Sequence, residues 1–380
     1  MKMDYMVCTN CVMDTTDPEI NFDEQGVCNH CHKFHDEITH KWHPNEEGTE
    51  KLNAIICEIK KAGKGKEYDC IIGLSGGVDS SYLALKASEW GLRPLVVHVD
   101  GGWNSELAVA NIEKILNYCN FDLHTHVVDW SEMRDLQLAY LKSGISNQDV
   151  PQDHIFFSTL NHFAVSNDIR FFLSGGNLAT ESIFPVSWHG SAMDAINLKA
   201  IHKKYGEIKL KKYKTISFCA YYIWYPLIKK MRTVRPLNLM AYNKNEALCE
   251  LQETLNYTPY PRKHGESFFT KFFQNYWLPQ KFGYDKRKPH FSSMILSQQM
   301  TRKEAVQKLD EPLYDPQELE EDIRYFCKKL RISTEEFEYL MNVPCSNYRD
   351  FPNWDLRYKI LKSLRNLFEM LPGFKVKISH

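Results

Sequence analysis

Two groups of residues in this chain of 380 have types and spacings that suit chemistry: a glycine-rich turn and a set of four cysteines. The turn follows an apolar run at 70–74 and precedes a helical apolar pattern at 81–90, and it reads Ser75, Gly76, Gly77, Val78, Asp79, Ser80. A strand, a tight turn and a helix N-terminus in this order present backbone N–H groups and partial positive charge to an anion. The two glycines let a phosphate approach the backbone. Asp79 suits the Mg²⁺ that accompanies a nucleotide phosphate.

The four cysteines form two CxxC pairs separated by 16 residues, Cys8 with Cys11 and Cys28 with Cys31. Four thiolates at this spacing suit a tetrahedral Zn²⁺, and a set of four leaves no coordination position open for catalysis. The segment is too short to bury a core, so we expect metal to supply much of its folding free energy. A redox pair and an iron–sulfur cluster are the alternatives.

The elements that must position the glycine turn alternate between strand and helix. Further strands are expected at 94–99, 123–128 and 170–173, with helical patterns between them and before the turn at 50–62, 104–117, 131–142 and 153–167. This alternation predicts βαβ units and therefore an α/β fold with a parallel, Rossmann-like sheet. We expect a zinc-binding module at 1–45, the sheet domain at 50–235, and a mostly helical region for substrate or partner binding at 236–380.

Ligands of a parallel sheet bind outside the carboxyl ends of its strands. The residues that follow the predicted strands should therefore meet in one crevice: the glycine turn, His98, Val99, Asp100, Asp129, Trp130, Ser174, Gly175, Gly176 and Asn177. Glu181 lies one turn beyond the second glycine turn and is a candidate for contacting phosphate or substrate. Asp100 could bind a ribose hydroxyl or cap the turn at 101–102. A lysine of the helical pattern at 193–205 could reach a phosphate, because no lysine follows the glycines at 76–77.

The run SGGVDS resembles the PP-loop of the ATP pyrophosphatases, which cleave ATP between the α and β phosphates and transfer AMP to a substrate oxygen. It lacks the lysine of the GxxxxGK[ST] loop of kinases and GTPases. The resemblance implies an adenine nucleotide α-hydrolase-like domain that uses ATP and Mg²⁺. It also implies that the end of the second strand, at His98, Val99 and Asp100, contacts adenine and ribose, and that Asp79, Ser80 and Glu181 are the catalytic candidates.

The segment 257–305 mixes charged and aromatic side chains. Its candidate substrate ligands are Lys263, His264, Glu266, Asp285, Arg287 and His290. Aromatic faces beside charged donors suit a sugar that carries phosphate groups, and they also suit RNA bases. A helical core with aromatic anchors is the structural alternative.

Composition limits the function classes. The net charge of −1 provides no global field for nucleic acid, and 11 cysteines in a chain of this length fit reduced thiols. The N-terminus shows no signal peptide, and the apolar stretch at 216–228 is too short to span a bilayer. We therefore expect a cytoplasmic protein with no membrane or nucleic-acid partner.

Five segments together resemble the N-acetyl sugar amidotransferase family: the CxxC pairs, SGGVDS, SGGNLATES, the stretch 264–293 and QMTRKEA. That resemblance covers nearly the whole chain. It implies an ATP-dependent amidotransferase that turns an acetamido group of a nucleotide-linked N-acetyl sugar into an acetamidino group, for bacterial O-antigen or flagellar glycans. It also implies a separate glutaminase subunit that supplies ammonia, and a tunnel or cyclase-like subunit as a further candidate partner.

Two rival functions fit parts of the sequence. A tRNA thiolase or lysidine-type synthetase also combines a PP-loop with other modules, and some thiolases carry N-terminal zinc knuckles. Thiolases usually need further paired cysteines, whereas Cys119, Cys219 and Cys249 are isolated in this chain. A non-catalytic zinc-bearing interaction protein is the third possibility, and the intact SGGVDS run argues against it.

Overall fold

A parallel five-stranded sheet forms the centre of the molecule, in a computed structural model that describes residues 4–261 and 265–369. Its strands are β1 (Cys70–Gly73), β2 (Pro94–Asp100), β3 (Leu123–Val127), β4 (Phe171–Leu173) and β5 (Arg232–Val234), in the order β3-β2-β1-β4-β5. The predicted α/β class and four predicted strands are confirmed. The fifth strand was not predicted, because three residues are too few to show a period of two. Its pairing with β4, Phe171 opposite Arg232 and Leu173 opposite Val234, establishes it.

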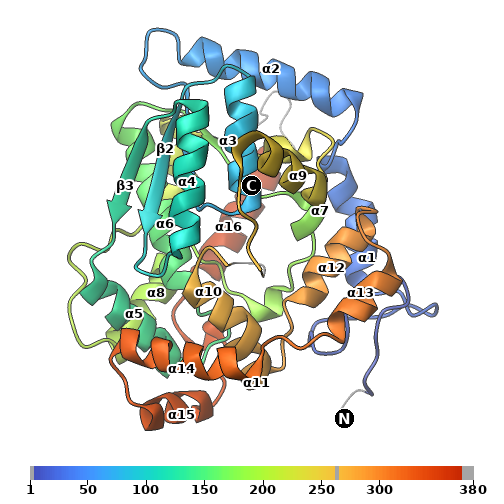
Figure 1. The fold of residues 1–380 in the computed structure, drawn as a ribbon, viewed down its shortest axis with the longest axis vertical. Coiled ribbons are helices and arrows are strands. Elements are labelled where there is room, and N and C mark those ends of the chain that lie inside the picture. Colours follow the sequence, from blue (N-terminus) through green and yellow to red (C-terminus); the bar gives the residue numbers. More distant parts are fainter. Residues whose placement is uncertain (1–3, 262–264, 370–380) are drawn as a thin grey trace.

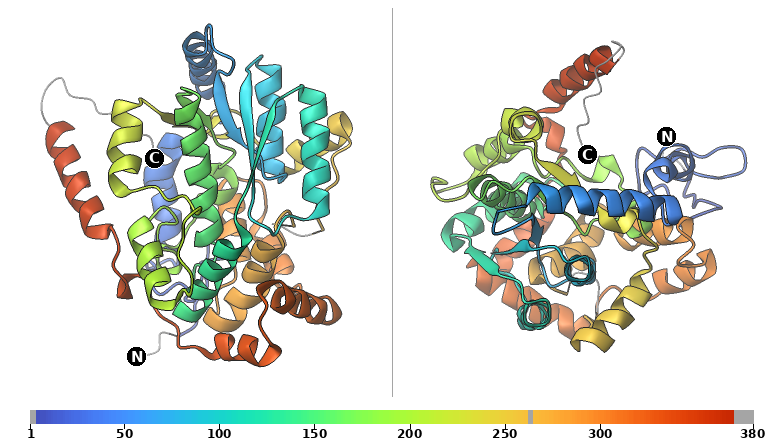
Figure 2. Two further views of the ribbon diagram at one scale, coloured as in Figure 1. Left: turned by 90° about the vertical axis from the view of Figure 1, so that its left-hand side faces the viewer. Right: turned by 90° about the horizontal axis from the view of Figure 1, so that it is seen from above.

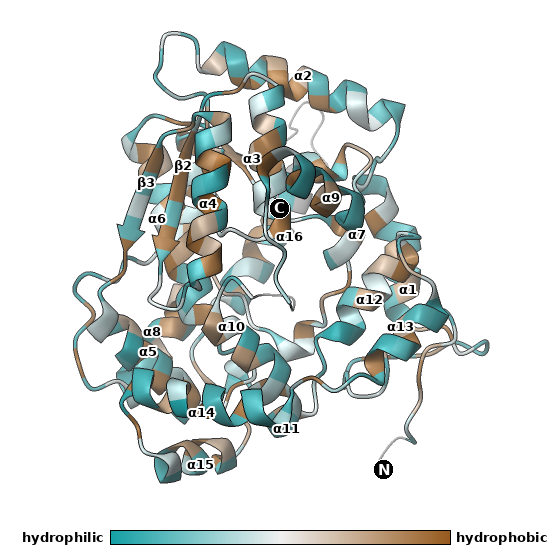
Figure 3. Ribbon diagram, in the orientation of Figure 1, coloured by the Kyte–Doolittle hydropathy of each residue, from teal (hydrophilic) through white to brown (hydrophobic). Residues whose placement is uncertain are grey.

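Helices cover both faces of the sheet (Figures 1 and 2). Successive strand residues point to opposite faces, so Ile71 and Ile72 enter different cores. The core that holds Ile71 is closed by α5 (Trp130–Ser143), α6 (Val150–Ser166) and α8 (Ala195–Tyr205). The opposite face packs against α2 (Glu46–Ala62), α3 (Val78–Glu89), α4 (Glu106–Cys119) and α9 (Lys244–Leu255). Figure 3 shows β2 as a hydrophobic element, as expected of a strand buried on both faces.

The strand order creates a switch point between β1 and β4. From β1 the chain moves to β2 and β3 on one side, and it returns through α5 and α6 to β4 on the other side of β1. A crevice opens at the carboxyl ends of the strands where the winding direction reverses. Both glycine turns follow strands that border this point, because one comes directly after β1 and the other directly after β4.

The region after β5 is helical, as predicted. Besides α9 it contains the helices α10 (Phe268–Phe272), α11 (Leu278–Phe282), α12 (Arg287–Leu296), α13 (Arg302–Leu309), α14 (Pro316–Leu330), α15 (Thr334–Asn342) and α16 (Asp355–Glu369). An aromatic core that includes Phe272 and Phe326 joins α10, α14 and α15 to Trp103 of the loop after β2. Side chains cap the N-termini of α13, α14 and α15, at Thr301, Asp315 and Ser333. In Figure 2, α16 projects from the side of the molecule.

Short helices make up the remaining elements. They are α1 (Asn29–Lys33), α7 (Leu178–Glu181), the π-helical turns η1 (Phe34–Ile38), η4 (Ala220–Ile228) and η6 (Phe273–Trp277), and the 3₁₀ turns η2 (Thr39–Lys41), η3 (Val186–Trp188), η5 (Pro236–Asn238) and η7 (Tyr348–Asp350). The apolar stretch 216–228 thus contains a π-helical turn with Pro226 inside it. In the described part of the chain, no helix combines the length and apolar character needed to cross a membrane.

Candidate active site

The first glycine turn connects β1 to the N-terminus of α3. The helix begins at Val78, three residues earlier than the pattern predicts, so Asp79 and Ser80 lie in its first turn. Gly77 is the N-cap, and no side chain caps the helix, so its first N–H groups are directed at the crevice with the positive end of the helix dipole. The hydroxyls of Ser75 and Ser80 lie 3.1 Å apart and brace the two ends of the turn.

Gly76 is the conformationally demanding residue of this turn. Its φ is +84°, and a Cβ there would lie 2.8 Å from the carbonyl oxygen of Ala108 on α4. Its own carbonyl accepts hydrogen bonds from the hydroxyls of Tyr257 at 2.8 Å and Tyr260 at 3.0 Å. The chain after α9 therefore holds the turn from behind, in a backbone shape that glycine adopts at little cost.

Asp79 has two partners on the opposite wall. The hydroxyl of Tyr242 donates to Oδ1, and Nζ of Lys244 lies 4.0 Å from Oδ2. Burial and the neighbouring Asp79 carboxylate raise the pKa of Tyr242 far above its ordinary value, so Tyr242 remains a neutral donor. Lys244 is the first residue of α9 and supplies the cation that the turn itself lacks.

The second glycine turn touches the first. A Cβ on Gly175 would lie 3.0 Å from the backbone of Asp79 and Ser80, so the two turns are in backbone contact. Asn177 accepts from the N–H of Thr180 at 2.9 Å and caps α7, which ends at Glu181. The predicted meeting of the two turns at one crevice is therefore present in the structure.

Two adjoining cavities lie at this edge of the sheet. The smaller one, of about 570 Å³, contains the phosphate turn and is lined also by Lys244 and Lys308. The other, of about 580 Å³, extends over the ends of β1, β2 and β4 to α6 and the start of α12. Residues that line both are Ser75, Gly175, Glu181, Glu266 and His290.

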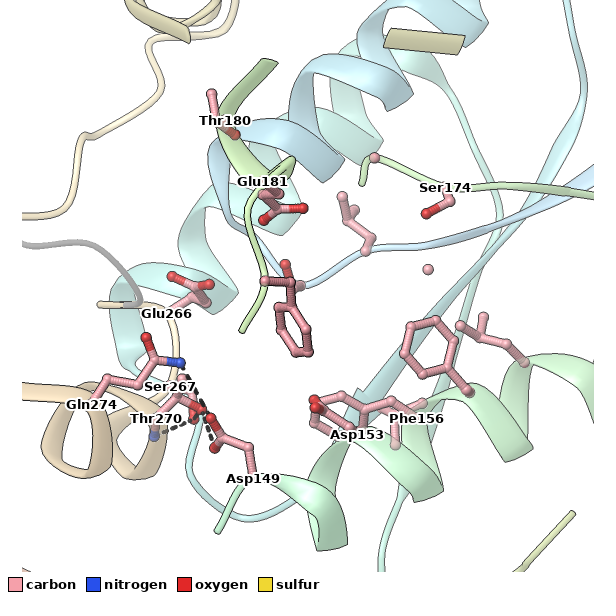
Figure 4. A pocket seen from close by; sticks show the side chains of 18 of the residues that line it. Asp149, Asp153, Phe156, Ser174, Thr180, Glu181, Glu266, Ser267, Thr270 and Gln274 are labelled. Atoms are coloured by element: carbon pink, nitrogen blue, oxygen red, sulfur yellow. Dashed lines mark hydrogen bonds between the residues drawn. The ribbon is translucent and has the colours of Figure 1, made fainter. Parts of the chain in front are cut away.

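The larger cavity has an apolar part and a charged part (Figure 4). Its apolar side chains include Phe156, Phe157, Leu160, Phe172 and Phe184. Its charged side includes Asp149, Asp153 and Lys286. Burial lowers the pKa of Lys286 to about 8, and burial together with Asp149 raises the pKa of Asp153 to about 8. Carboxyl and ammonium groups with shifted pKa values in a cleft are features of catalytic sites.

Two predicted nucleotide ligands are hydrogen-bonded within the protein. His98 lines the larger cavity, but Nδ1 donates to the carbonyl of Leu74 at 2.8 Å and Nε2 accepts from Asn104 at 2.8 Å. Asp100 accepts from the N–H of Gly102 at 2.8 Å and from Asn104 at 3.1 Å, so its carboxylate organises the turn at 101–102. Val99 lines the cavity beside His98.

Several expectations were wrong. Asp129 caps α5 and pairs with Lys212 at 2.8 Å, and it lies outside the crevice because β3 is the edge strand. Asp285 and Arg287 pair with each other at 2.8 Å. The same guanidinium donates to the backbone that ends α13, so this pair is architectural. The lysines of α8 do not line either cavity, because α8 packs against α5.

Other candidates lie where expected or outside the described residues. Glu266 and His290 line both cavities, and His290 donates to the carbonyl of Thr180 at 2.9 Å. Lys263 and His264 lie outside the residues that the structure describes. Sequence reasoning missed Asp149, Asp153, His189, Tyr242, Lys244 and Lys286. One sequence signal could have indicated the aspartate pair: Asp149 and Asp153 are four residues apart, at the start of a predicted helix.

The helical region that completes the cavities carries the family match. Residues 266–365 match the family described as LPS biosynthesis protein WbpG-like, C-terminal domain. The matched stretch supplies Glu266, Lys286 and His290 to the cavities described above. No curated protein matches the chain significantly.

Three solved structures with some similarity to this chain are synthetases. NMN synthetase from Francisella tularensis has a TM-score of 0.36 at 14% identity, over 71% of this chain and 98% of its own. NAD⁺ synthetase from Burkholderia pseudomallei has a TM-score of 0.29 at 15% identity, over 59% and 94%. NH3-dependent NAD synthetase from Campylobacter jejuni subsp. jejuni has a TM-score of 0.28 at 13% identity, over 41% and 72%.

The four N-terminal cysteines form a second candidate site. Their sulfur atoms lie within 4.8 Å of one another, and three of the separations are 3.7, 3.7 and 3.8 Å. A tetrahedron with metal–sulfur bonds of about 2.3 Å has edges of about 3.8 Å, so the sulfur positions fit Zn²⁺. Such distances are far too long for a disulfide. Gly26, with φ +76°, makes the turn before the second pair.

The cysteine module is fastened to the region that carries the family match. Arg302 donates to the carbonyls of Cys8 at 3.0 Å and Cys11 at 2.9 Å. The backbone N–H of Val12 donates to Ser292 on α12 at 3.1 Å. Helix α12 also carries His290 and packs against α7. Arg302, which the sequence alone would leave as a surface charge, thus connects the cysteine site to the scaffold of the cavities.

Proposed function

We propose that this protein is an ATP-dependent, AMP-forming amidotransferase that converts the acetamido group of a nucleotide-linked N-acetyl sugar into an acetamidino group. One observation carries the proposal. The uncapped N-terminus of α3 and the two glycine turns line the phosphate pocket, and this pocket shares Glu181, Glu266 and His290 with the larger cavity. The match of residues 266–365 to an LPS biosynthesis domain supports a role in surface polysaccharide synthesis.

The reaction has two steps whose atoms balance. In the first, the acetamido oxygen attacks the α-phosphorus of ATP, the bond to the bridging oxygen breaks, and pyrophosphate leaves. The amide N–H proton is lost, which gives an O-adenylyl imidate. In the second, ammonia adds to the imidate carbon, loses a proton, and the carbon–oxygen bond breaks. AMP leaves with the former acetyl oxygen, and an amidine remains.

The phosphate pocket provides positioning and charge stabilisation. The backbone of the turn at 75–80 and the N-terminus of α3 hold the phosphates, and Lys244 neutralises charge on the departing pyrophosphate. Asp79 and Glu181 offer the carboxylate oxygens that Mg²⁺ prefers, so the lining fits the metal that accompanies ATP. Ser80, in the same helix turn as Asp79, donates to the phosphates.

The larger cavity takes the sugar nucleotide. Its volume of about 580 Å³ lies within the range of small-molecule sites, about 300–1,000 Å³. Phe156 and Phe157 offer apolar faces to a planar ring, and the charged side near Lys286 suits the polar groups of a sugar. Zn²⁺ at Cys8, Cys11, Cys28 and Cys31 is structural in this proposal, because four thiolates fill its coordination shell.

Ammonia comes from a partner in this proposal. Among the described residues no cysteine lines either cavity, so no nucleophilic thiol is at hand for glutamine hydrolysis there. A separate cytoplasmic glutaminase, with a tunnel or cyclase-like subunit as a further candidate, would deliver ammonia. The same lining disfavours a tRNA thiolase, because such enzymes usually use catalytic cysteines beside the PP-loop.

The test is ATP–pyrophosphate exchange with a panel of UDP- and CMP-linked N-acetyl sugars. One acceptor should support exchange, and ammonium should then give amidine, AMP and pyrophosphate in equal amounts. The matched control is the same sugar nucleotide with a hydroxyl in place of its acetamido group, which should support neither reaction. Exchange that depends on tRNA, or ATP cleavage to ADP, would show that the proposal is wrong.

A further inference from the structure

A pair of aspartates lies at the start of α6, on the wall of the larger cavity (Figure 4). Asp149 is the N-cap residue, and Asp153 follows one helical turn later, so both side chains lie on one face. The carboxylate of Asp149 already accepts two hydrogen bonds within the protein. Its Oδ1 accepts from the hydroxyl of Thr270 at 3.0 Å and its Oδ2 from the amide of Gln274 at 3.3 Å.

Asp153 is half-buried, and it lines the cavity. Within residues 4–261 and 265–369, no hydrogen bond to its carboxylate is present. Burial and the charge of Asp149 raise the pKa of Asp153 to about 8, while Lys286 opposes that rise. A carboxylate with such a pKa is a much stronger base than an ordinary aspartate.

The groups around Asp153 come from several elements. Lys286, the N-cap of α12, lines the same cavity, and its Nζ lies 2.7 Å from Nε2 of His189. Burial and Lys286 keep the pKa of His189 well below its ordinary value, so this imidazole is neutral. Behind Asp153, Tyr213 has a pKa raised well above its ordinary value by burial, and its hydroxyl donates to the carbonyl of Pro151 at 2.6 Å.

We propose that Asp153 is the catalytic base that takes a proton from ammonium, so that ammonia forms beside the adenylylated acetamido carbon and attacks it. This inference rests on the proposed function. A proton of ammonium moves to a carboxylate oxygen of Asp153, the resulting ammonia forms the new carbon–nitrogen bond and loses a second proton to solvent, and the carbon–oxygen bond to AMP then breaks. The proton leaves Asp153 to solvent before the next turnover.

The choice of Asp153 follows from the alternatives in the cavity. Both oxygens of Asp149 already accept hydrogen bonds, so Asp149 positions its neighbour and adds negative charge. Glu181 and Glu266 lie at the boundary with the phosphate pocket, where ATP and Mg²⁺ bind in the proposed function. Paired carboxylates also attract ammonium and suit the amidinium product, whose planar N–H fork resembles the guanidinium of arginine.

The experiment compares two nucleophiles near pH 8, where about half of the Asp153 side chains are ionised, using the whole protein. Ammonium must lose a proton, whereas hydroxylamine is already uncharged and gives an N-hydroxyamidine. We expect Asp153→Asn to slow amidine formation from ammonium about 10²-fold or more, and the hydroxylamine reaction far less. The slowing of the ammonium reaction in Asp153→Asn should also become smaller as the pH approaches the pKa of ammonium, because free ammonia is then available as the nucleophile.

The matched control is Asp168→Asn, which makes the same chemical change on the surface. The Asp168 side chain is 76% exposed, and its φ of 49° is a conformation that asparagine adopts readily. It should change neither reaction. Asp153→Glu, which keeps a carboxylate, should recover part of the ammonium reaction, and so it tests the inference even if Asp153→Asn folds poorly.

Two results would overturn the inference. One is an equal loss with ammonium and hydroxylamine in both Asp153 variants, which would make Asp153 a binding or structural residue. The other is an ammonium reaction in Asp153→Asn that matches the wild type. If instead wild-type protein shows no pyrophosphate exchange with any acetamido sugar, the proposed function itself fails, and the inference fails with it for that separate reason.

Discussion

The hydroxyl of Tyr242 donates a hydrogen bond to the carboxylate of Asp79, across a separation of 163 residues. Tyr242 lies directly before α9, whereas Asp79 lies in the first turn of α3. These two helices pack together on one face of the sheet. The contact therefore fixes the orientation of the one carboxylate within the phosphate turn, and it does so from the region that follows the sheet.

Asp79→Asn keeps the size of this side chain and removes its charge. We expect the variant to bind Mg²⁺ more weakly and to catalyse adenylation about 10²–10³-fold more slowly, because a preorganised electrostatic contact is lost. Tyr242→Phe keeps the carboxylate and should have a smaller effect. Pyrophosphate release with the acetamido sugar nucleotide measures both. Zinc content should stay unchanged in each variant, whereas an unaltered release rate in Asp79→Asn would show that the turn is only structural.

Gly76→Ala tests the shape of the same turn. The new Cβ would lie 2.8 Å from the backbone of Ala108 and would occupy a left-handed conformation, φ +84°. We expect ATP affinity to be lost, as measured by calorimetry, with the thermal unfolding temperature also lowered. Gly65→Ala is a matched control, because Gly65 also has a positive φ but has no neighbour within 4 Å of the added Cβ. ATP binding by Gly76→Ala at wild-type affinity would refute this account of the turn.

The metal site should stabilise the cavity scaffold through Arg302. Arg302→Ala leaves the carbonyls of Cys8 and Cys11 without their donor, so we expect it to cost about 2 kcal/mol of stability while zinc remains bound. Cys28→Ser should lose zinc and lower stability further. Metal analysis and chemical denaturation distinguish the two. Arg324→Ala, at a side chain 69% exposed on α14, serves as the control. Iron at full occupancy, or a disulfide, in anaerobically purified protein would disprove a zinc site.

The nitrogen source can be tested with the isolated chain. With glutamine as the only donor we expect no amidine, and ammonium at high concentration should restore turnover. The physical reason is that the cavities have no cysteine among their described lining residues to hydrolyse glutamine. Product is followed by mass spectrometry. Glutamine-dependent turnover by the pure chain would mean that it carries its own glutaminase.

Asp153 should leave a signature in the pH dependence of stability. Its pKa is raised from 3.8 to about 8, so the folded protein holds a proton that the unfolded chain releases, and the free energy of unfolding falls as pH rises across that window. Asp153→Asn removes this slope, so the difference in melting temperature between variant and wild type should grow in favour of the variant from acid to mildly alkaline pH.

Two features keep that measurement specific. Lys286, whose pKa is lowered from 10.5 to about 8, changes stability only above that window. Asp168 has its pKa lowered by Lys66, so Asp168→Asn should show no trend between acid and mildly alkaline pH. A melting-temperature difference for Asp153→Asn that is constant with pH would contradict the shifted pKa.

The sequence by itself determined the features that depend on neighbouring residues. Consecutive residues encode the strand, the glycine turn and the start of the helix, so the turn at 75–80 and four of the five strands could be predicted. The spacing within each CxxC pair likewise restricts the sulfur positions locally. Capping residues such as Thr301 and Asp315 act on N–H groups two or three residues away, and they too were predictable.

Only the tertiary structure decided which side chains complete the site. Tyr242 reaches Asp79 and Lys286 reaches His189 because the strand order and the packing of α9 and α12 bring distant segments together. Asp285 and Arg287 have the residue types of ligands, yet they bond to each other, while Lys286 between them faces the cavity. Local patterns encode backbone conformation, whereas the direction of a side chain toward a cavity depends on contacts between residues far apart in the chain.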